Sequence, residues 1–136
     1  MNSMLRGTAI VMLALCFAAC SSSNAAPPVK PSIDEARATQ IARSELEAYN
    51  AGDYVAWSRD WSQTMRDAIK EADFRAFRDQ ALASKGRFVA IKSVDLSSHR
   101  AGTYRYTFAV TFEKGDVTYW IAFMDGGSQV EGIHFE

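Results

Sequence analysis

The sequence predicts an α+β domain in which N-terminal helices pack on a curved antiparallel sheet of about four strands. Two observations carry this prediction. Apolar residues recur at helical spacing up to Lys85, and from Arg87 onward they recur at every second position. Helices that precede a run of strands are typical of α+β folds, in which the helices cover one face of the sheet.

The first helix is expected to begin after Pro31 and to run to about Asn50. Ser32 can cap the free amides at its start, and Glu35 three residues later completes a capping box. Gly52 supplies the stop. We expect the buried stripe to hold Ile33, Ile41, Ala42, Leu46 and Tyr49, and the solvated face to hold Glu35, Arg37, Arg43, Glu45 and Glu47.

Three shorter helices are expected to follow the first. Asp53 can cap the second helix, which runs from Tyr54 toward Trp61. The third and fourth helices are expected over residues 64–70 and 73–85, and a glycine directly after the fourth ends it.

The second predicted strand shows the cleanest alternation in the chain. A strand over 88–96 and a turn over 97–102 are expected to precede it. Small or polar side chains occupy every second position of this strand, so one of its faces is expected to be buried. The apolar face holds Tyr104, Tyr106, Phe108, Val110 and Phe112.

A two-residue hairpin loop at Lys114 and Gly115 is expected to join this strand to the next. That loop would pair Phe112 with Val117, and every later pair on this face would also be apolar. It would place Trp120 on the opposite, outer face. A turn over 125–128 then leads into a last strand over 129–135.

The first 19 residues resemble a bacterial lipoprotein signal peptide. Arg6 supplies a positive charge, and the apolar run over 7–19 is too short to span a bilayer as a helix. Small residues directly precede Cys20, as they do where signal peptidase II cuts before a cysteine whose sulfur carries a diacylglycerol. We therefore expect residues 1–19 to be removed and Cys20 to be lipidated.

The alternative is an ordinary secretory signal cut after Ala18 or Ala19, which would leave a soluble periplasmic protein. Phe17 stands where the lipobox most often has leucine. The lipoprotein interpretation is favoured by residues 20–31, which are small, polar and proline-bearing, as a flexible tether needs to be. The folded domain would then cover residues 32–136.

Lipidation would anchor the domain in the bacterial cell envelope, so the membrane is its first expected partner. Ser21 follows the cysteine where enteric-type bacteria use aspartate to retain a lipoprotein in the inner membrane. By that resemblance the expected location is the outer membrane, facing the periplasm.

Composition argues against several classes of function. The formal net charge is −1, and loss of Arg6 with the leader makes it one unit more negative, so nucleic acid is not an expected partner. Cys16 leaves with the leader, which leaves Cys20 as the one cysteine of the mature chain and no disulfide. The chain has two histidines and no spaced ligand motif, so we expect no metal site and no cofactor.

The segment Ala48-Tyr49-Asn50-Ala51-Gly52-Asp53-Tyr54, which precedes a tryptophan-bearing stretch, resembles the end of the first helix in NTF2-like (cystatin-like, SnoaL-type) domains. Gly86-Arg87-Phe88 and the two glycine-bearing turns that follow are similar to small domains of the DUF3887 type. The resemblance covers about residues 33–136. It implies a cone in which the sheet wraps the first helix around an apolar cavity, and it implies no established activity.

Trp57 and Trp61 are candidate pocket residues, because they lie four positions apart and would share one side of a helix. They could form an aromatic wall for an apolar ligand, or they could be core. Tyr106 and Tyr119 bring hydroxyls to an apolar face. These hydroxyls could orient a ligand, or they could satisfy one another or the backbone.

His134 is the remaining candidate. A two-residue turn at Gly126 and Gly127 would pair Phe123 with Val130 and would place His134 beside Tyr119 on the inner face. One extra residue in the loop would put His134 in water.

These observations predict an exported binding or interaction domain without enzymatic activity, which takes a small apolar ligand in the cone or an envelope protein as partner. The alternative is a SnoaL- or isomerase-like acid–base enzyme that uses His134 with Tyr119. No residue is assigned a catalytic role on the sequence alone.

Overall fold

The computed structural model describes residues 31–100 and 102–136, so the predictions for the leader and for Cys20 lie outside the described residues. Four helices precede four strands, as the sequence predicts. The helices are α1 (Glu35–Ala51), α2 (Tyr54–Trp57), α3 (Gln63–Ala68) and α4 (Glu71–Lys85), and the strands are β1 (Phe88–Arg100), β2 (Thr103–Phe112), β3 (Gly115–Met124) and β4 (Val130–Phe135).

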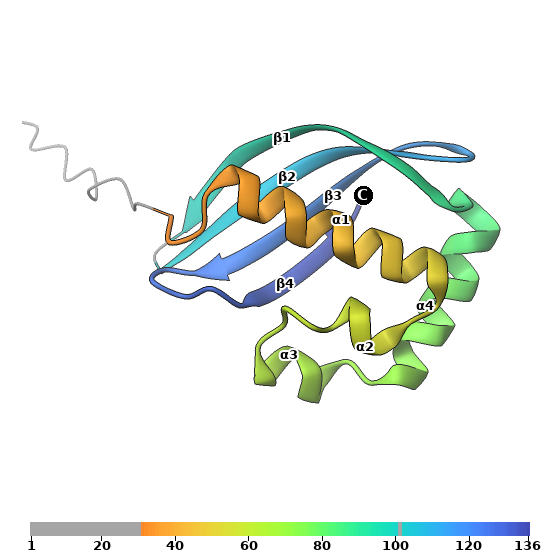
Figure 1. Ribbon diagram of the computed structural model, residues 1–136, viewed down its shortest axis with the longest axis horizontal. Coiled ribbons are helices and arrows are strands. Elements are labelled where there is room, and N and C mark those ends of the chain that lie inside the picture. Colours follow the sequence, from red (N-terminus) through yellow and green to blue (C-terminus); the bar gives the residue numbers. More distant parts are fainter. Residues whose placement is uncertain (1–30, 101) are drawn as a thin grey trace, which may run out of the picture.

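The four strands form one antiparallel sheet in the order β1-β2-β3-β4. Figure 1 shows that the sheet is curved and that α1 crosses one of its faces. Helices α2 and α3 lie beyond the β4 side of the sheet, and α4 stands at the end where the β2–β3 hairpin turns. The predicted α+β arrangement, with N-terminal helices on a curved antiparallel sheet, is therefore confirmed.

The start of α1 differs from the prediction. Asp34, and not Ser32, is the N-cap, and its carboxylate accepts a hydrogen bond from the Arg37 amide at 2.8 Å. Ser32 instead shares a hydrogen bond with the Tyr104 hydroxyl at 2.8 Å, so its side chain ties the helix entry to β2. The predicted end is confirmed, because Gly52 adopts a φ of 72° and closes the helix.

The second helix is shorter than predicted. Asp53 caps it as expected, but α2 ends at Trp57. Trp61 lies in the following loop and forms an isolated parallel bridge with Val130 of β4. The two tryptophans therefore do not share one helix. Helix α4 begins at Glu71, two residues earlier than predicted.

Strand β1 continues past its predicted end to Arg100 and β2 begins at Thr103, so most of the turn expected over 97–102 is strand. Its pairing with β2 is irregular at three places, between Phe88 and Ala90, Ile91 and Ser93, and Leu96 and Ser98. These irregularities let a long strand follow the curvature of the sheet.

The predicted register of the β2–β3 hairpin is wrong by two residues. Phe112 pairs with Gly115 and Val110 pairs with Val117, so the loop is Glu113–Lys114. Contacts outside the hairpin hold this loop, since the Glu113 amide donates to the Arg87 carbonyl at 2.9 Å and the Glu113 carboxylate accepts from the Arg87 amide at 2.9 Å. A shift of two residues leaves every side chain on its predicted face, and Trp120 lies on the outer face as predicted.

The core lies between α1 and the concave face of the sheet. Its largest fully buried side chains come from α1, the α2–α3 loop, α4 and the inner face of β2 and β3. The apolar members of this buried set are Ile41, Leu46, Tyr49, Trp61, Phe74, Tyr104, Phe108, Val110, Tyr119, Ile121 and Phe123.

None of the helices among the described residues is long and apolar enough to cross a membrane.

Candidate functional site

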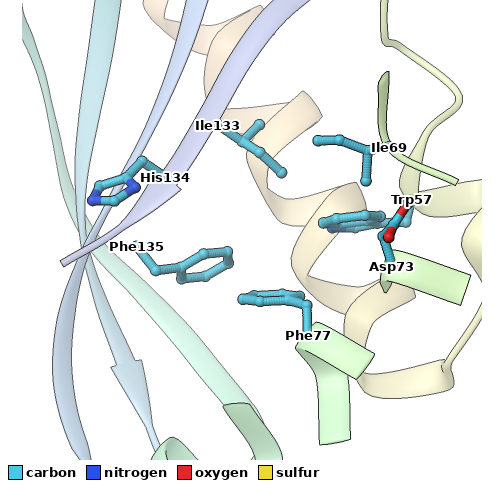
Figure 2. Close-up of a pocket in the computed structure, with 7 residues that line it drawn as sticks. All are labelled: Trp57, Ile69, Asp73, Phe77, Ile133, His134 and Phe135. Atoms are coloured by element: carbon cyan, nitrogen blue, oxygen red, sulfur yellow. The ribbon is translucent and has the colours of Figure 1, made fainter. Parts of the chain in front are cut away.

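A pocket of about 380 Å³ opens between the edge of β4 and helices α2 and α4. This volume falls in the range of about 300–1,000 Å³ that small-ligand sites occupy. Figure 2 shows its lining side chains, which come from four separate parts of the chain. They are Trp57 on α2, Ile69 after α3, Asp73 and Phe77 on α4, and Ile133, His134 and Phe135 on β4.

Aromatic rings connect the pocket wall to the core. Trp57 stacks on Phe77 with ring centroids 6.0 Å apart and an angle of 14° between the rings. The ring centroid of Phe77 lies 5.3 Å from that of Phe135, and the ring centroid of Phe135 lies 4.5 Å from that of Tyr119. Trp57 is only 3% exposed, whereas Phe77 and Phe135 are half-buried. The wall is therefore a continuation of the core whose outer rings reach solvent.

The pocket has one charged side chain, Asp73. It is exposed at the rim on the first turn of α4, where its Oδ2 accepts a hydrogen bond from the Lys70 amide at 2.9 Å. Among the described residues, no cation forms an ion pair with it. The pocket thus combines an apolar interior with an unneutralised carboxylate at its mouth.

A β-bulge at Glu131 decides which side chains of β4 face this pocket. Phe123 pairs with Val130 as predicted, but the next pair joins Ala122 to Gly132, so Glu131 is left over. The α2–α3 loop holds the bulged segment, because the Ser62 amide donates to the Val130 carbonyl at 2.9 Å. The Ser62 hydroxyl also donates to the Glu131 carboxylate, at 2.8 Å.

Because of the bulge, His134 does not lie beside Tyr119 on the inner face, as a regular ladder after the two-residue turn would place it. The bulge turns Ile133 and Phe135 toward the helices and places His134 on the outer face, opposite Trp120 of β3. In Figure 2 the His134 ring points away from the other lining side chains, although its strand borders the pocket. His134 is exposed, with its ring 5.5 Å from that of Trp120.

Behind the pocket wall lies a buried carboxyl that the sequence analysis placed in solvent. Glu45 of α1 is 1% exposed. Its Oε1 accepts a hydrogen bond from the Trp61 indole nitrogen at 2.8 Å, and its Oε2 is in hydrogen-bond contact with the Tyr119 hydroxyl. This Glu45 cluster, made of Glu45, Trp61 and Tyr119, joins α1, the α2–α3 loop and β3.

Burial dominates the electrostatics of the Glu45 cluster. It raises the pKa of the Glu45 carboxyl from 4.5 to about 8, against the opposing effect of the hydrogen bonds from Tyr119 and Trp61. The negative charge of Asp60 also raises this pKa. Burial, followed by the charge of Glu45, raises the pKa of Tyr119 well above its ordinary value. Glu45 therefore carries a proton at neutral pH.

The structure places the remaining candidates in the core. Trp61 and Tyr119 are fully buried, and both bind Glu45. Tyr106 is 3% exposed, and its hydroxyl donates to the Ile33 carbonyl at 2.7 Å. Of the five candidates, Trp57 alone sends its side chain into the pocket wall. The rings of Trp57 and Trp61 nevertheless touch, with centroids 4.5 Å apart.

The proposed acid–base pair is not formed. Tyr119 lies on the inner face and is fully buried, whereas His134 lies on the outer face, so the sheet separates the two groups. Among the described residues there is no cluster of three or more metal-ligating side chains. The residues around the pocket can therefore hold an apolar group and a nearby positive charge.

Sequence reasoning missed Ile69, Asp73, Phe77, Ile133 and Phe135 as pocket residues. The bulge hides the last two, since a regular ladder would have turned them outward. The signal for Glu45 was present in the sequence: it stands four residues after Ile41 and four before Tyr49, within the apolar stripe of α1.

No family model matches the chain, and no curated protein matches it. The fold is similar to that of a protein from Ruminococcus gnavus ATCC 29149, whose structure was determined by NMR. The TM-score is 0.59 at 16% identity, over 77% of this chain and 94% of that one. At this identity the likeness concerns the fold alone.

Proposed function

We propose that this chain is an exported, lipid-anchored binding protein of the NTF2-like kind, whose domain takes up an apolar group in the pocket beside β4. The observation that carries the proposal is the pocket itself. It has about 380 Å³ of space, walls of buried and half-buried aromatic and aliphatic side chains, and a carboxylate at the rim. An apolar cavity with few, well-placed polar groups is the usual form of a ligand site.

The distribution of titratable groups supports binding over catalysis. A general acid or base has to come within hydrogen-bond reach of a substrate. Glu45 and Tyr119 are buried and bound to each other, and His134 lies on the outer face. Among the described residues, Asp73 alone places a carboxylate at the pocket, and it also caps α4.

The proposed anchor at Cys20 would hold this pocket in the cell envelope. The predicted tether over residues 20–31 separates this anchor from the domain by about eleven residues, which at about 3.5 Å per residue reach at most about 40 Å. The domain would then collect its ligand close to the membrane surface.

A fluorescent probe tests the proposed function. The neutral dye N-phenyl-1-naphthylamine brightens in apolar surroundings and has no charge to be repelled by Asp73. We expect saturable binding to the chain made from Ser21 onward. Ile69→Asp should weaken binding at least tenfold, because it places a carboxylate in the apolar wall.

Val55→Asp is the matched control, since Val55 is 77% exposed and lies outside the pocket. It makes the same kind of change and should leave dye binding unaltered. Circular dichroism of both variants checks that they are folded. Binding that is absent in the parent protein, or that is lost equally in both variants, would contradict the proposed function.

A further inference from the structure

The edge of the sheet is open beside the pocket. Strand β4 is the last strand of the sheet, and within the part of the chain that the structure describes the α2–α3 loop pairs with it at Val130 alone. There the Val130 amide donates to the Asp60 carbonyl at 2.8 Å and the Val130 carbonyl accepts from the Ser62 amide at 2.9 Å. Past this bridge the chain enters α3, which packs beside β4, and among the described residues no backbone hydrogen bond joins α3 to the strand.

Two residues of β4 line the pocket with their side chains and point their backbone N–H and C=O groups toward the open edge of the sheet. At the end of the strand, Glu136 and Thr118 of β3 exchange two backbone hydrogen bonds, at 2.8 and 3.1 Å. In an antiparallel ladder such residues alternate with residues whose N–H and C=O groups point the other way. Phe135 and Ile133 are therefore the residues whose backbone groups point to the open edge, and their side chains line the pocket.

The two edges of the sheet are not equivalent. Strand β1, at the other edge, is irregular at three places along its pairing with β2. Such bulges are a known means of preventing an edge from pairing with another chain. The ladder between β3 and β4 has one irregularity, next to Phe123, and from Gly132 onward it is regular. The open and regular edge is the one that adjoins an apolar pocket.

From these observations we infer that the occupant of the pocket is an extended segment of a partner protein, which adds to β4 as a further strand of the sheet. One of its apolar side chains enters between Trp57 and Phe135, and a basic side chain lies beside Asp73. This inference rests on the proposed function and names the class of ligand. Backbone pairing supplies affinity in such complexes, and the pocket selects the alternate side chains.

The chemistry of the site favours a peptide over a compact apolar molecule. A molecule that only filled the pocket would leave the edge N–H and C=O groups of Ile133 and Phe135 to water, whereas a strand pairs with them. The lone carboxylate of Asp73 lacks a cation among the described residues and would meet one in a lysine or arginine.

The test uses the mature protein purified from its own cell envelope in lipid nanodiscs. The probe is a seven-residue synthetic peptide that alternates phenylalanine or isoleucine with threonine and ends in lysine. Hydrogen–deuterium exchange is followed by mass spectrometry with and without the peptide. We expect the amides of Ile133 and Phe135 to exchange at least tenfold more slowly with peptide, and fragments of β1 to be unchanged.

Two methylated peptides separate strand pairing from simple filling of the pocket. One carries N-methyl groups on its apolar residues and the other on its threonines, so that each blocks the amides on one edge of the extended peptide. Pairing with β4 needs only one edge, so one methylated peptide should bind like the parent and the other should lose at least tenfold in affinity. Equal affinities would overturn the inference.

Charge provides a third readout. Asp73→Asn keeps an oxygen that can accept the bond from the Lys70 amide and removes the charge. It should weaken the lysine peptide several-fold and should not weaken a peptide that ends in glutamate. Asp79→Asn, on the exposed side of the same helix, is the control and should change neither.

The outcomes distinguish this inference from the proposed function. If the naphthylamine dye binds and the peptide leaves β4 unprotected, the pocket takes a small molecule and the inference is wrong. If neither binds, both proposals fail. Protection that arises at β1 instead of β4 would also overturn the inference, because the partner would then use the other edge.

Discussion

Glu45 shows how a single residue can belong to the core and still carry a titratable group. Its carboxyl lies between the Trp61 indole and the Tyr119 hydroxyl, so both of its oxygens have partners. A buried polar group without partners costs about 1–3 kcal/mol, and a buried charge costs more. The cluster is therefore tolerated in the core because it is hydrogen-bonded and because Glu45 holds its proton at neutral pH.

The raised pKa of Glu45 makes stability depend on pH. Between pH 4.5 and about 8 the folded chain holds a proton that the unfolded chain has lost. The free energy of unfolding therefore falls as pH rises in this window, by at most about 1.4 kcal/mol per unit from this group. Glu45→Gln should abolish this contribution, which urea denaturation at pH 5, 6, 7 and 8 measures as the difference from the parent.

Glu47→Gln is the matched control, because Glu47 is exposed on the same helix. It should leave the slope of stability against pH unchanged. The glutamine at position 45 can still accept from the Trp61 indole and donate to the Tyr119 hydroxyl, so the folded structure should persist. An equal slope in the parent and in Glu45→Gln would assign the pH dependence to another group.

At the scale of elements, the β2–β3 hairpin shows that alternation of apolar and polar residues determines which face of a strand is buried but not the register of its pairing. Alternation predicts which side chains are buried, and all five members of the apolar face of β2 are buried. It does not distinguish two registers that differ by two residues, since from Val110 back to Tyr106 both registers pair apolar side chains with apolar side chains. The contacts of the Glu113–Lys114 loop with the end of α4 and with Arg87 select the observed register.

Phe108 in the middle of this hairpin should be costly to truncate. It is fully buried and pairs with Tyr119. Phe108→Ala should lower the free energy of unfolding by about 3–5 kcal/mol, a large share of the total of about 5–15 kcal/mol for a domain. Chemical denaturation measures it, with Val89→Ala as the control because Val89 is 58% exposed. A Phe108→Ala protein as stable as its parent would mean that the apolar face is solvated.

At the scale of the whole molecule, caps and residue alternation in the sequence were enough to predict the architecture. Caps at Asp53 and Gly52 and the alternation in β2 are local, and they predicted the helices and the sheet. The pocket was not predictable in this way. Trp57 and Phe135 meet there from distant positions, and the Glu131 bulge depends on contacts with Ser62 that no periodicity reveals.

The anchor is a prediction about the whole molecule, and it is tested on the intact protein. The mature chain purified from its host should begin at residue 20 and carry acyl mass on Cys20. Cys20→Ser should remove that mass, whereas Cys16→Ser should keep it, because Cys16 lies in the predicted leader. Intact-mass spectrometry of the parent protein and the two variants measures the acyl mass. A parent protein that begins at residue 19 or 20 without acyl mass would support the ordinary secretory signal instead.

The bulge at Glu131 has a consequence for how this fold can change. If one residue were inserted after Glu131 and the bulge kept, every later residue of β4 would turn over. His134 would then face the helices beside Tyr119, and Phe135 would face solvent. In this domain a single codon separates an apolar wall from a histidine–tyrosine pair. The length of the segment from Val130 to Phe135 in related chains therefore says more about their chemistry than the identity of its residues.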